Sequence, residues 1–445
     1  MLFLAMRSIR YRPGRFLATL LASFLGATII MVFNSMHDTA GASGVDDVTA
    51  EFLGVAASIV GGYGTLLVFF SVASTLTVNV RQRDEEIALL RNTGATPAQI
   101  KRMVLGEAVA VALVGVLLAI VPAMFGGRAL LEAFQDSGQA SPDVDHAFGA
   151  IALTAGFGVT LLASMGAAFL AVRRATRAAA GANRSTGRGR TFTGAAALVV
   201  GAATVCATFA FDATDPALMG APAYGSIVVA VGLALFSPVL LRVFLGWLRR
   251  PLTALFGVNG RLAVHNMRQR AAQLAGMLMP LVLFTGLATA TLTMQSVEND
   301  MVKASGLTKS VANKNLEAIN LTVVGIIVVF SCIMLINSLY AATSYRRQEF
   351  GQQRLVGATP GQVLGMVGVE ALVLTVAGVF LGTAAALTGI LPFSLVRADE
   401  VLPDQVLGVW LGVVAVAVVA TLATSLATAR RTLRAPAVEA VALTA

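Results

Sequence analysis

The sequence predicts an all-α, polytopic membrane protein with about ten transmembrane helices, arranged as two parallel four-helix repeats and a two-helix insert. The composition, a series of long apolar blocks and an internal repeat all favour this class. Of the 445 residues, 57% are hydrophobic and only 12% are charged, and the mean hydropathy is +0.80. A soluble surface needs roughly a quarter to a third of its residues charged, so this chain cannot cover its apolar side chains in water.

Ten apolar blocks follow one another along the chain, each near or above the ~20 residues that cross a bilayer as a helix. The first block is too long for the core of a signal peptide and no convincing small-residue cleavage site follows it, so we expect a retained membrane anchor. The blocks cover about residues 15–35, 53–80, 108–128, 149–172, 193–211, 223–247, 272–296, 318–343, 371–396 and 405–429.

The basic residues are distributed unevenly between the gaps that separate these blocks. Of the 32 Lys and Arg, 27 fall in alternate gaps, and only Arg128, Lys303, Lys309, Lys314 and Arg397 fall in the others. Loops on the cytoplasmic side of a membrane carry such an excess of Lys and Arg, so we expect both termini in the cytoplasm. The net charge of +9 then reflects topology and anionic lipid headgroups, and we expect no nucleic-acid partner.

One segment of the sequence occurs twice, at a constant offset of 263 residues. Residues 86–107 read EIALLRNTGATPAQIKRMVLGE and residues 349–370 read EFGQQRLVGATPGQVLGMVGVE, with Glu, Arg, Gly-Ala-Thr-Pro, Gln and the closing Glu in common. Each copy lies between the second and third expected spans of a four-span set. An even number of spans separates the copies, so both have the same orientation, as in parallel repeats related by an axis along the membrane normal.

The repeat divides the chain into four parts. Residues 1–172 form the first four-span repeat, and residues 173–190 form a small, polar and basic linker on the cytoplasmic side. Residues 191–250 form the two-span insert. Residues 251–445 contain an Arg-rich helix that leads into a span, the second four-span repeat and a cytoplasmic tail.

The doubled segment predicts a helix–turn–helix. Gly94 stands where a helix ends in the left-handed conformation, and Thr96, Pro97 and Gln99 form the pattern of an N-cap, a first helical proline and a capping box. The second copy has the same pattern after Gly357. A plain interfacial turn, which only returns the chain to the bilayer, is the alternative interpretation of either copy.

The chain contains no source of energy of its own. No Asp, Glu or His lies in the central part of an expected span, although proton-coupled carriers need such a group on the transport path. None of the four lysines follows a glycine, so there is no P-loop to hold ATP. Cys206, Cys332 and the three isolated histidines, which we expect at surfaces, form no catalytic or metal-binding pattern. We therefore expect no enzymatic activity and no cofactor in this chain, with ATP and Mg bound by a partner.

The doubled Glu…Arg-x-x-Gly-Ala-Thr-Pro-x-Gln…Glu pattern resembles the FtsX-like permeases, a family that includes the lipoprotein-releasing and macrolide-exporter permeases. Residues 431–440, RTLRAPAVEA, are similar to the usual C-terminus of that family. The resemblance covers nearly the whole chain apart from the insert. In contrast to many members, this chain has only short loops where the family places a large extracytoplasmic domain.

The resemblance implies that both copies form coupling helices that dock on an ATPase. In the first copy it assigns this role to Arg91, Gly94, Ala95, Thr96, Pro97, Gln99, Ile100 and Met103. In the second copy it assigns the role to Arg354, Gly357, Ala358, Thr359, Pro360, Gln362, Val363 and Met366. Polar contacts to the ATPase are expected from Glu86, Glu349, Glu107 and Glu370. A solvated helix face is the alternative role of Arg91, Arg354, Glu86 and Glu349.

We therefore expect the permease subunit of a bacterial ABC transporter in the cytoplasmic membrane, driven by an ATPase homodimer and exporting an amphipathic or lipid-like substrate. Two other functions remain open. The chain could transmit ATPase motion to envelope enzymes without transporting anything, as the cell-division members of the family are thought to do. It could also be a gradient-driven secondary transporter, with sodium held by backbone carbonyls.

Overall fold

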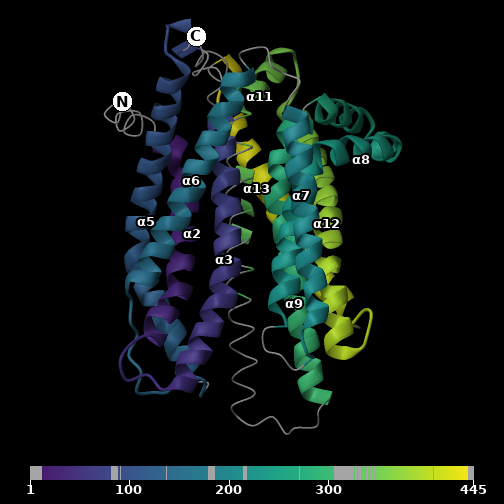
Figure 1. The fold of residues 1–445 in the computed structure, drawn as a ribbon. Helices are drawn as coiled ribbons and strands as arrows, with labels where there is room; N and C mark the ends of the chain where they lie inside the picture. Colours follow the sequence, from purple (N-terminus) through teal and green to yellow (C-terminus); the bar gives the residue numbers. More distant parts are fainter. Residues whose placement is uncertain are drawn as a thin grey trace. The chain divides into compact units, whose positions relative to one another are not determined.

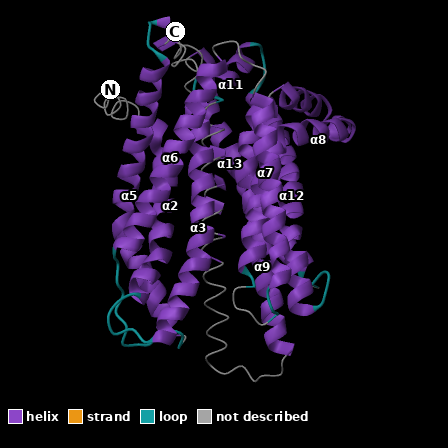
Figure 2. Ribbon diagram, viewed as in Figure 1, coloured by secondary structure: helices purple, strands orange, loops and turns teal. Residues whose placement is uncertain are grey.

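The computed structural model describes residues 13–81, 89–90, 92–136, 138–178, 186–213, 218–269, 271–304, scattered positions between 325 and 343, 346–403 and 405–438. Every regular element among these residues is a helix, which confirms the predicted all-α class (Figure 2). The α-helices are α2 (Pro13–Ala40), α3 (Asp47–Arg81), α5 (Pro97–Asp136), α6 (Ala150–Ala178), α7 (Thr186–Cys206), α8 (Gly220–Gln269), α9 (Ala271–Ala304), α11 (Arg347–Leu355), α12 (Pro360–Ala398) and α13 (Val406–Leu433). A short 3₁₀ helix, η1 (Ala207–Ala210), follows α7.

Eight of the described helices are long and apolar enough to cross a membrane, which confirms a multi-pass membrane protein. They lie in α2, α5, α6, α7, α8, α9, α12 and α13. Helix α3 runs through the expected block 53–80, and the expected block 318–343 falls largely outside the described residues. The total of ten spans and the repeat architecture remain predictions.

The chain forms two compact units. In the first unit, α2 packs against α3, α5 and α6, and α6 also packs against α3 and α5 (Figure 1). Small side chains permit close approach of membrane helices, and the core of this bundle is rich in alanine. Its buried members include Ala27, Met31, Val116, Ala119, Ala123 and Ala152.

The connection between α5 and α6 is fixed to the end of α2 by side-chain hydrogen bonds. The carboxylate of Asp38 accepts from the backbone N–H groups of Ile151 and Ala152, at 3.0 and 2.8 Å, and so caps the start of α6. In the same region the half-buried ring of His146 lies 3.1 Å from the Ser35 hydroxyl. Gly127 leaves room for that ring, because a Cβ atom there would lie 2.4 Å from His146 Nε2.

The second unit contains α7, η1, α8, most of α9, α11, α12 and α13. Helices α9 and α12 cross closely at Gly286, Gly378 and Gly382, where the Thr285 hydroxyl donates to the carbonyl of Gly378 at 3.3 Å. A Cβ atom on Gly382 would lie 1.7 Å from Thr285 Oγ1 and 3.0 Å from the backbone nitrogen of Gly286. The small-residue spacing of α12 therefore serves helix packing.

Glycines also bring α7 and α8 close together. A Cβ atom on Gly201 of α7 would lie 2.8 Å from the backbone nitrogen of Val229, and one on Gly225 of α8 would lie 2.9 Å from that of Val205. The backbones are thus in direct contact. Farther along α8 the chain changes direction at Gly257, whose φ of +53° and ψ of −125° interrupt the helix.

Candidate functional site

The two copies of the repeated segment form two turns with the same backbone course. We call residues 89–100 the first turn and residues 352–363 the second turn. The first turn leads into α5 and the second joins α11 to α12. Gly94 and Gly357 have φ angles of +94° and +103°, a conformation that costs a residue with a Cβ atom free energy and that glycine adopts readily.

The hydrogen bonds that end the preceding helices correspond at the offset of 263 residues. The N–H of Ala95 donates to the carbonyl of Leu90 at 2.9 Å, and the N–H of Ala358 donates to that of Gln353 at 3.0 Å. This six-residue closure around a left-handed glycine is the Schellman motif, which satisfies helix-end carbonyls. Both glycines therefore end a helix, as the sequence predicts.

A capping box starts the helix that follows each turn. The N–H of Thr96 donates to Gln99 Oε1 at 2.9 Å, and the N–H of Gln99 donates to Thr96 Oγ1 at 3.3 Å. Thr359 and Gln362 make the same two bonds at the same distances. The helix starts predicted at Pro97 and Pro360 are thus confirmed.

Each turn stands on a buried apolar face. Ile100 and Val363, which correspond at the offset, are each 2% exposed. Met366 is buried, and Met103, Ala95 and Ala358 are half-buried. These side chains pack inside the protein and support the turns. The exposed members of the predicted coupling set are Gly94, Thr96, Gln99, Gly357, Thr359, Pro360 and Gln362.

The remaining predicted residues have different positions. Arg91 and Glu86 lie outside the described residues, and Pro97 opens α5. Glu107 and Glu370 are buried, at 2% and 3% exposure. A surface contact to a partner from these two carboxylates would require them to leave the interior.

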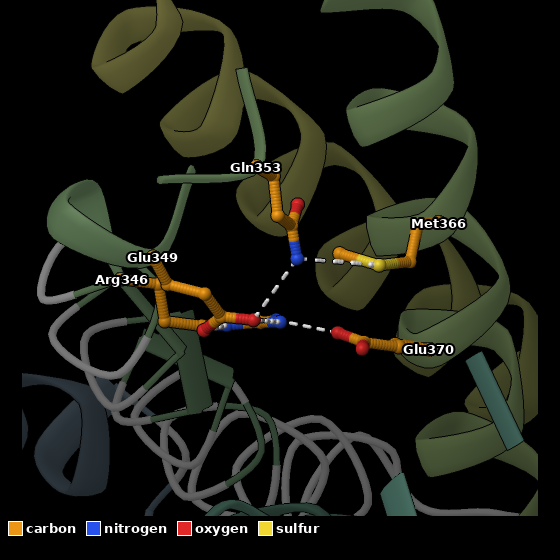
Figure 3. A network of polar contacts seen from close by, with 5 residues as sticks. All are labelled: Arg346, Glu349, Gln353, Met366 and Glu370. Atoms are coloured by element: carbon orange, nitrogen blue, oxygen red, sulfur yellow. Dashed lines mark hydrogen bonds and ion pairs between the residues drawn. The ribbon is translucent and has the colours of Figure 1, made fainter. Parts of the chain in front are cut away.

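An ionic cluster connects the two sides of the second turn (Figure 3). Arg346, directly before α11, donates to both carboxylate oxygens of Glu349, at 2.9 and 3.0 Å, and to Glu370 in α12. The amide of Gln353 donates to Glu349 Oε1 at 3.4 Å and lies 3.7 Å from the sulfur of Met366. Both predicted carboxylates of the second copy are therefore engaged inside the molecule.

The cluster fixes the charge of Arg346. Burial lowers the pKa of this guanidinium, but the hydrogen bonds and negative charges of Glu349 and Glu370 outweigh burial and raise the pKa above its ordinary value. The side chain of Arg346 is 15% exposed and that of Glu370 is 4% exposed. Arg346 therefore remains a cation while it is shielded from water.

Arg354 fixes the end of the second turn to α13. Its Nη1 atom donates to the carbonyls of Leu433 and Ala435, at 3.1 and 2.7 Å. These carbonyls lie at the C-terminal end of a helix, where backbone acceptors lack helical partners and a cation is stabilised. In this structure Arg354 is thus a positioning residue of the turn.

Sequence analysis missed Arg346, although a signal for it exists. Arg83 and Arg346 stand at the same offset of 263 residues as the rest of the motif. Extending the comparison a few residues upstream of Glu86 and Glu349 would have included this pair. The ionic partners of Arg346 could not be read from that repetition.

Comparison with known families agrees with this geometry. The family model for the C-terminal region of FtsX-like permeases matches residues 58–180 and 321–437, together more than half of the chain. Each matched stretch contains one of the two turns. No curated protein matches the chain.

Proposed function

This chain belongs to the FtsX-like permease family, and from that membership we propose that its two turns couple an ABC transporter permease to a separate ATPase dimer. Members of this family are membrane components of ABC transporter type and generally work with an ABC ATPase. The observation that carries the proposal is the pair of turns with matching hydrogen bonds and exposed tips.

The turns have the properties of docking elements. A binding site needs residues whose conformations are fixed by packing and hydrogen bonds. Each turn has a Schellman motif on one side, a capping box on the other and a buried aliphatic residue beneath. A plain re-entry turn requires none of these features twice.

The second turn is also connected to the membrane helix that follows it. Helix α12 begins at Pro360, inside the turn, and continues to Ala398. Arg346 joins the chain before the turn to Glu370, ten residues into the same helix. A displacement of the turn by a docked ATPase would therefore move the start of α12 with it, because packed elements shift as rigid bodies.

The proposal places the turns and both termini in the cytoplasm of a bacterial cell, in agreement with the distribution of Lys and Arg. ATP and Mg would be bound by the ATPase subunits, which form a homodimer. Export of an amphipathic or lipid-like substrate follows the lipoprotein-releasing and macrolide-exporting members of the family.

Co-purification tests this function. The chain is co-expressed with a candidate ABC ATPase from the same cell, as wild type and as Gly94→Val/Gly357→Val. Valine is strained at both φ angles, so the variant should lose most of the ATPase that the wild type retains. Gly106→Ala/Gly408→Ala is the control, because neither position has a positive φ and a Cβ atom would meet nothing within 4 Å. Full retention of ATPase by the valine variant, with its thermal unfolding unchanged, would contradict coupling through the turns.

Reconstitution separates this function from its two alternatives. Vesicles that contain the chain and its ATPase should move a lipid-like substrate when ATP is added. ATPase activity without transport would indicate the mechanical regulator, and transport without any ATPase would indicate the secondary transporter. A mechanical regulator also needs an outer contact, whereas α2 and α3 are joined only by residues 41–46.

A further inference from the structure

The two turns share one backbone geometry but differ in the chemistry of their tips. Asn92 and Thr93 in the first turn correspond to Leu355 and Val356 at the offset of 263 residues. All four side chains are exposed, and Val356, at 90%, is the most exposed large apolar residue in the described part of the chain. The first turn thus presents polar groups where the second presents aliphatic ones.

The shapes of these side chains correspond closely. Threonine and valine are both β-branched and differ by a hydroxyl in place of a methyl group, and asparagine and leucine both branch at Cγ. In the first turn the Thr93 hydroxyl donates to the carbonyl of Leu90 at 2.8 Å. One pocket shape can therefore accept either tip, but only the second tip gains free energy by leaving water.

The helices that follow the two turns differ in charge: α5 is charged where α12 is not. Lys101 and Arg102 of α5 are exposed, whereas the corresponding Leu364 and Gly365 of α12 are half-buried and uncharged. The Lys101 ammonium lies 4.1 Å from the centroid of the Phe169 ring, which holds it against α6. The helix after the first turn therefore presents two cations at positions where the helix after the second turn has no charge.

Other apolar and basic groups near the turns do not remove this difference. Leu89 is 65% exposed, and its counterpart Gln352 is exposed and polar. The first turn thus also exposes one aliphatic group, but on the helix before its tip. Arg354 in the second turn is a further cation, but its guanidinium is bound to the carbonyls of Leu433 and Ala435. Among the described residues, the tips and the pair Lys101 and Arg102 therefore distinguish the two sites.

We propose that the two turns bind the ATPase by different forces, the second by burial of Leu355 and Val356 and the first by attraction of Lys101 and Arg102 to carboxylates. The inference rests on the proposed function and names the surface of the partner. Each ATPase subunit would present a pocket with an apolar floor and an acidic rim. Identical subunits would then be held with unequal affinity, and salt would release the subunit at the first turn before the one at the second.

Exchange of the tips tests this inference. Leu355→Asn/Val356→Thr gives the second turn the tip of the first, and Asn92→Leu/Thr93→Val gives the first turn the tip of the second. The first exchange removes two buried aliphatic groups and should weaken ATPase binding about tenfold or more. The second exchange adds two such groups and should strengthen binding. Lys101→Leu/Arg102→Gly should remove most of the salt dependence of the weaker site. Leu89→Gln is a matched control away from the tips and should have little effect.

The measurement is native mass spectrometry of the complex in detergent between about 50 and 500 mM salt, over more than a threefold range of Debye length. A species with one ATPase subunit should accumulate at intermediate salt in the wild type. Equal losses from both tip exchanges, or direct passage from two subunits to none, would overturn the inference while leaving the proposed function intact. A wild-type chain that holds no ATPase at low salt would instead overturn the proposed function.

Discussion

Glu370 is a carboxylate on an apolar helix, and its surroundings explain why it is tolerated there. It is 3% exposed, and Arg346 supplies a counter-charge from a different element. Removing one partner of a buried ion pair costs far more than removing both, because the other charge is left uncompensated. The cluster is therefore expected to stabilise the protein only while both the arginine and the carboxylates are present.

Replacing Arg346 alone should destabilise the protein strongly. Arg346→Met removes the cation that pairs with Glu349 and Glu370, and we expect a loss of about 3–5 kcal/mol in unfolding free energy. Adding Glu349→Gln/Glu370→Gln should restore most of this loss. Thermal unfolding of both variants in one detergent gives the comparison. Equal melting temperatures for wild type and Arg346→Met would show that the cluster contributes no stability.

Capping chemistry shows how much of an element can be predicted from the sequence. The starts of α5 and α12 were predicted correctly because the bonds of Thr96 with Gln99, and of Thr359 with Gln362, span only three residues. The bond from Arg346 to Glu370 spans 24 residues and depends on how α11 packs on α12. The sequence contains both residues but not the packing that brings them together, so the carboxylate was expected to face a partner.

The connection between α5 and α6 also contains a residue whose surroundings the sequence did not predict. His146 was expected at a surface, yet its ring is half-buried against Ser35. Burial and the charge of Arg128 lower the pKa of His146, and Asp38 opposes them only in part. The folded state thus binds a proton less readily than the unfolded state, whose histidine pKa is about 6.5.

The stability contributed by His146 should be complete above about pH 6.5 and should be lost as the pH falls below that value. We therefore expect the wild-type melting temperature to fall between pH 7.5 and 5.5 by more than that of His146→Gln. The glutamine retains a group that can bond to Ser35 and does not titrate. Parallel pH profiles of the two proteins would contradict this role, since His37 and His265 are present in both.

At the scale of the whole molecule, the distribution of charges makes a topological prediction. Both turns should face the same side of the membrane, opposite to the exposed Asp143 between α5 and α6. Thr96→Cys and Thr359→Cys, in a chain with Cys206 and Cys332 replaced by serine, should react with a membrane-impermeant maleimide only in inverted vesicles. Asp143→Cys should react only in intact cells. Labelling of the two turns from opposite sides would exclude parallel repeats.

The length of α12 has a mechanical consequence. Its 39 residues extend about 58 Å at 1.5 Å per residue, nearly twice the ~30 Å of the hydrocarbon core. Pro392 lies only six residues from its end, so most of the helix is an uninterrupted lever arm. A tilt of about 5° imposed at Pro360 would displace the far end by roughly 5 Å, about the rise of one helical turn. A small displacement of the second turn is therefore large enough to change which side chains meet at the other end of α12.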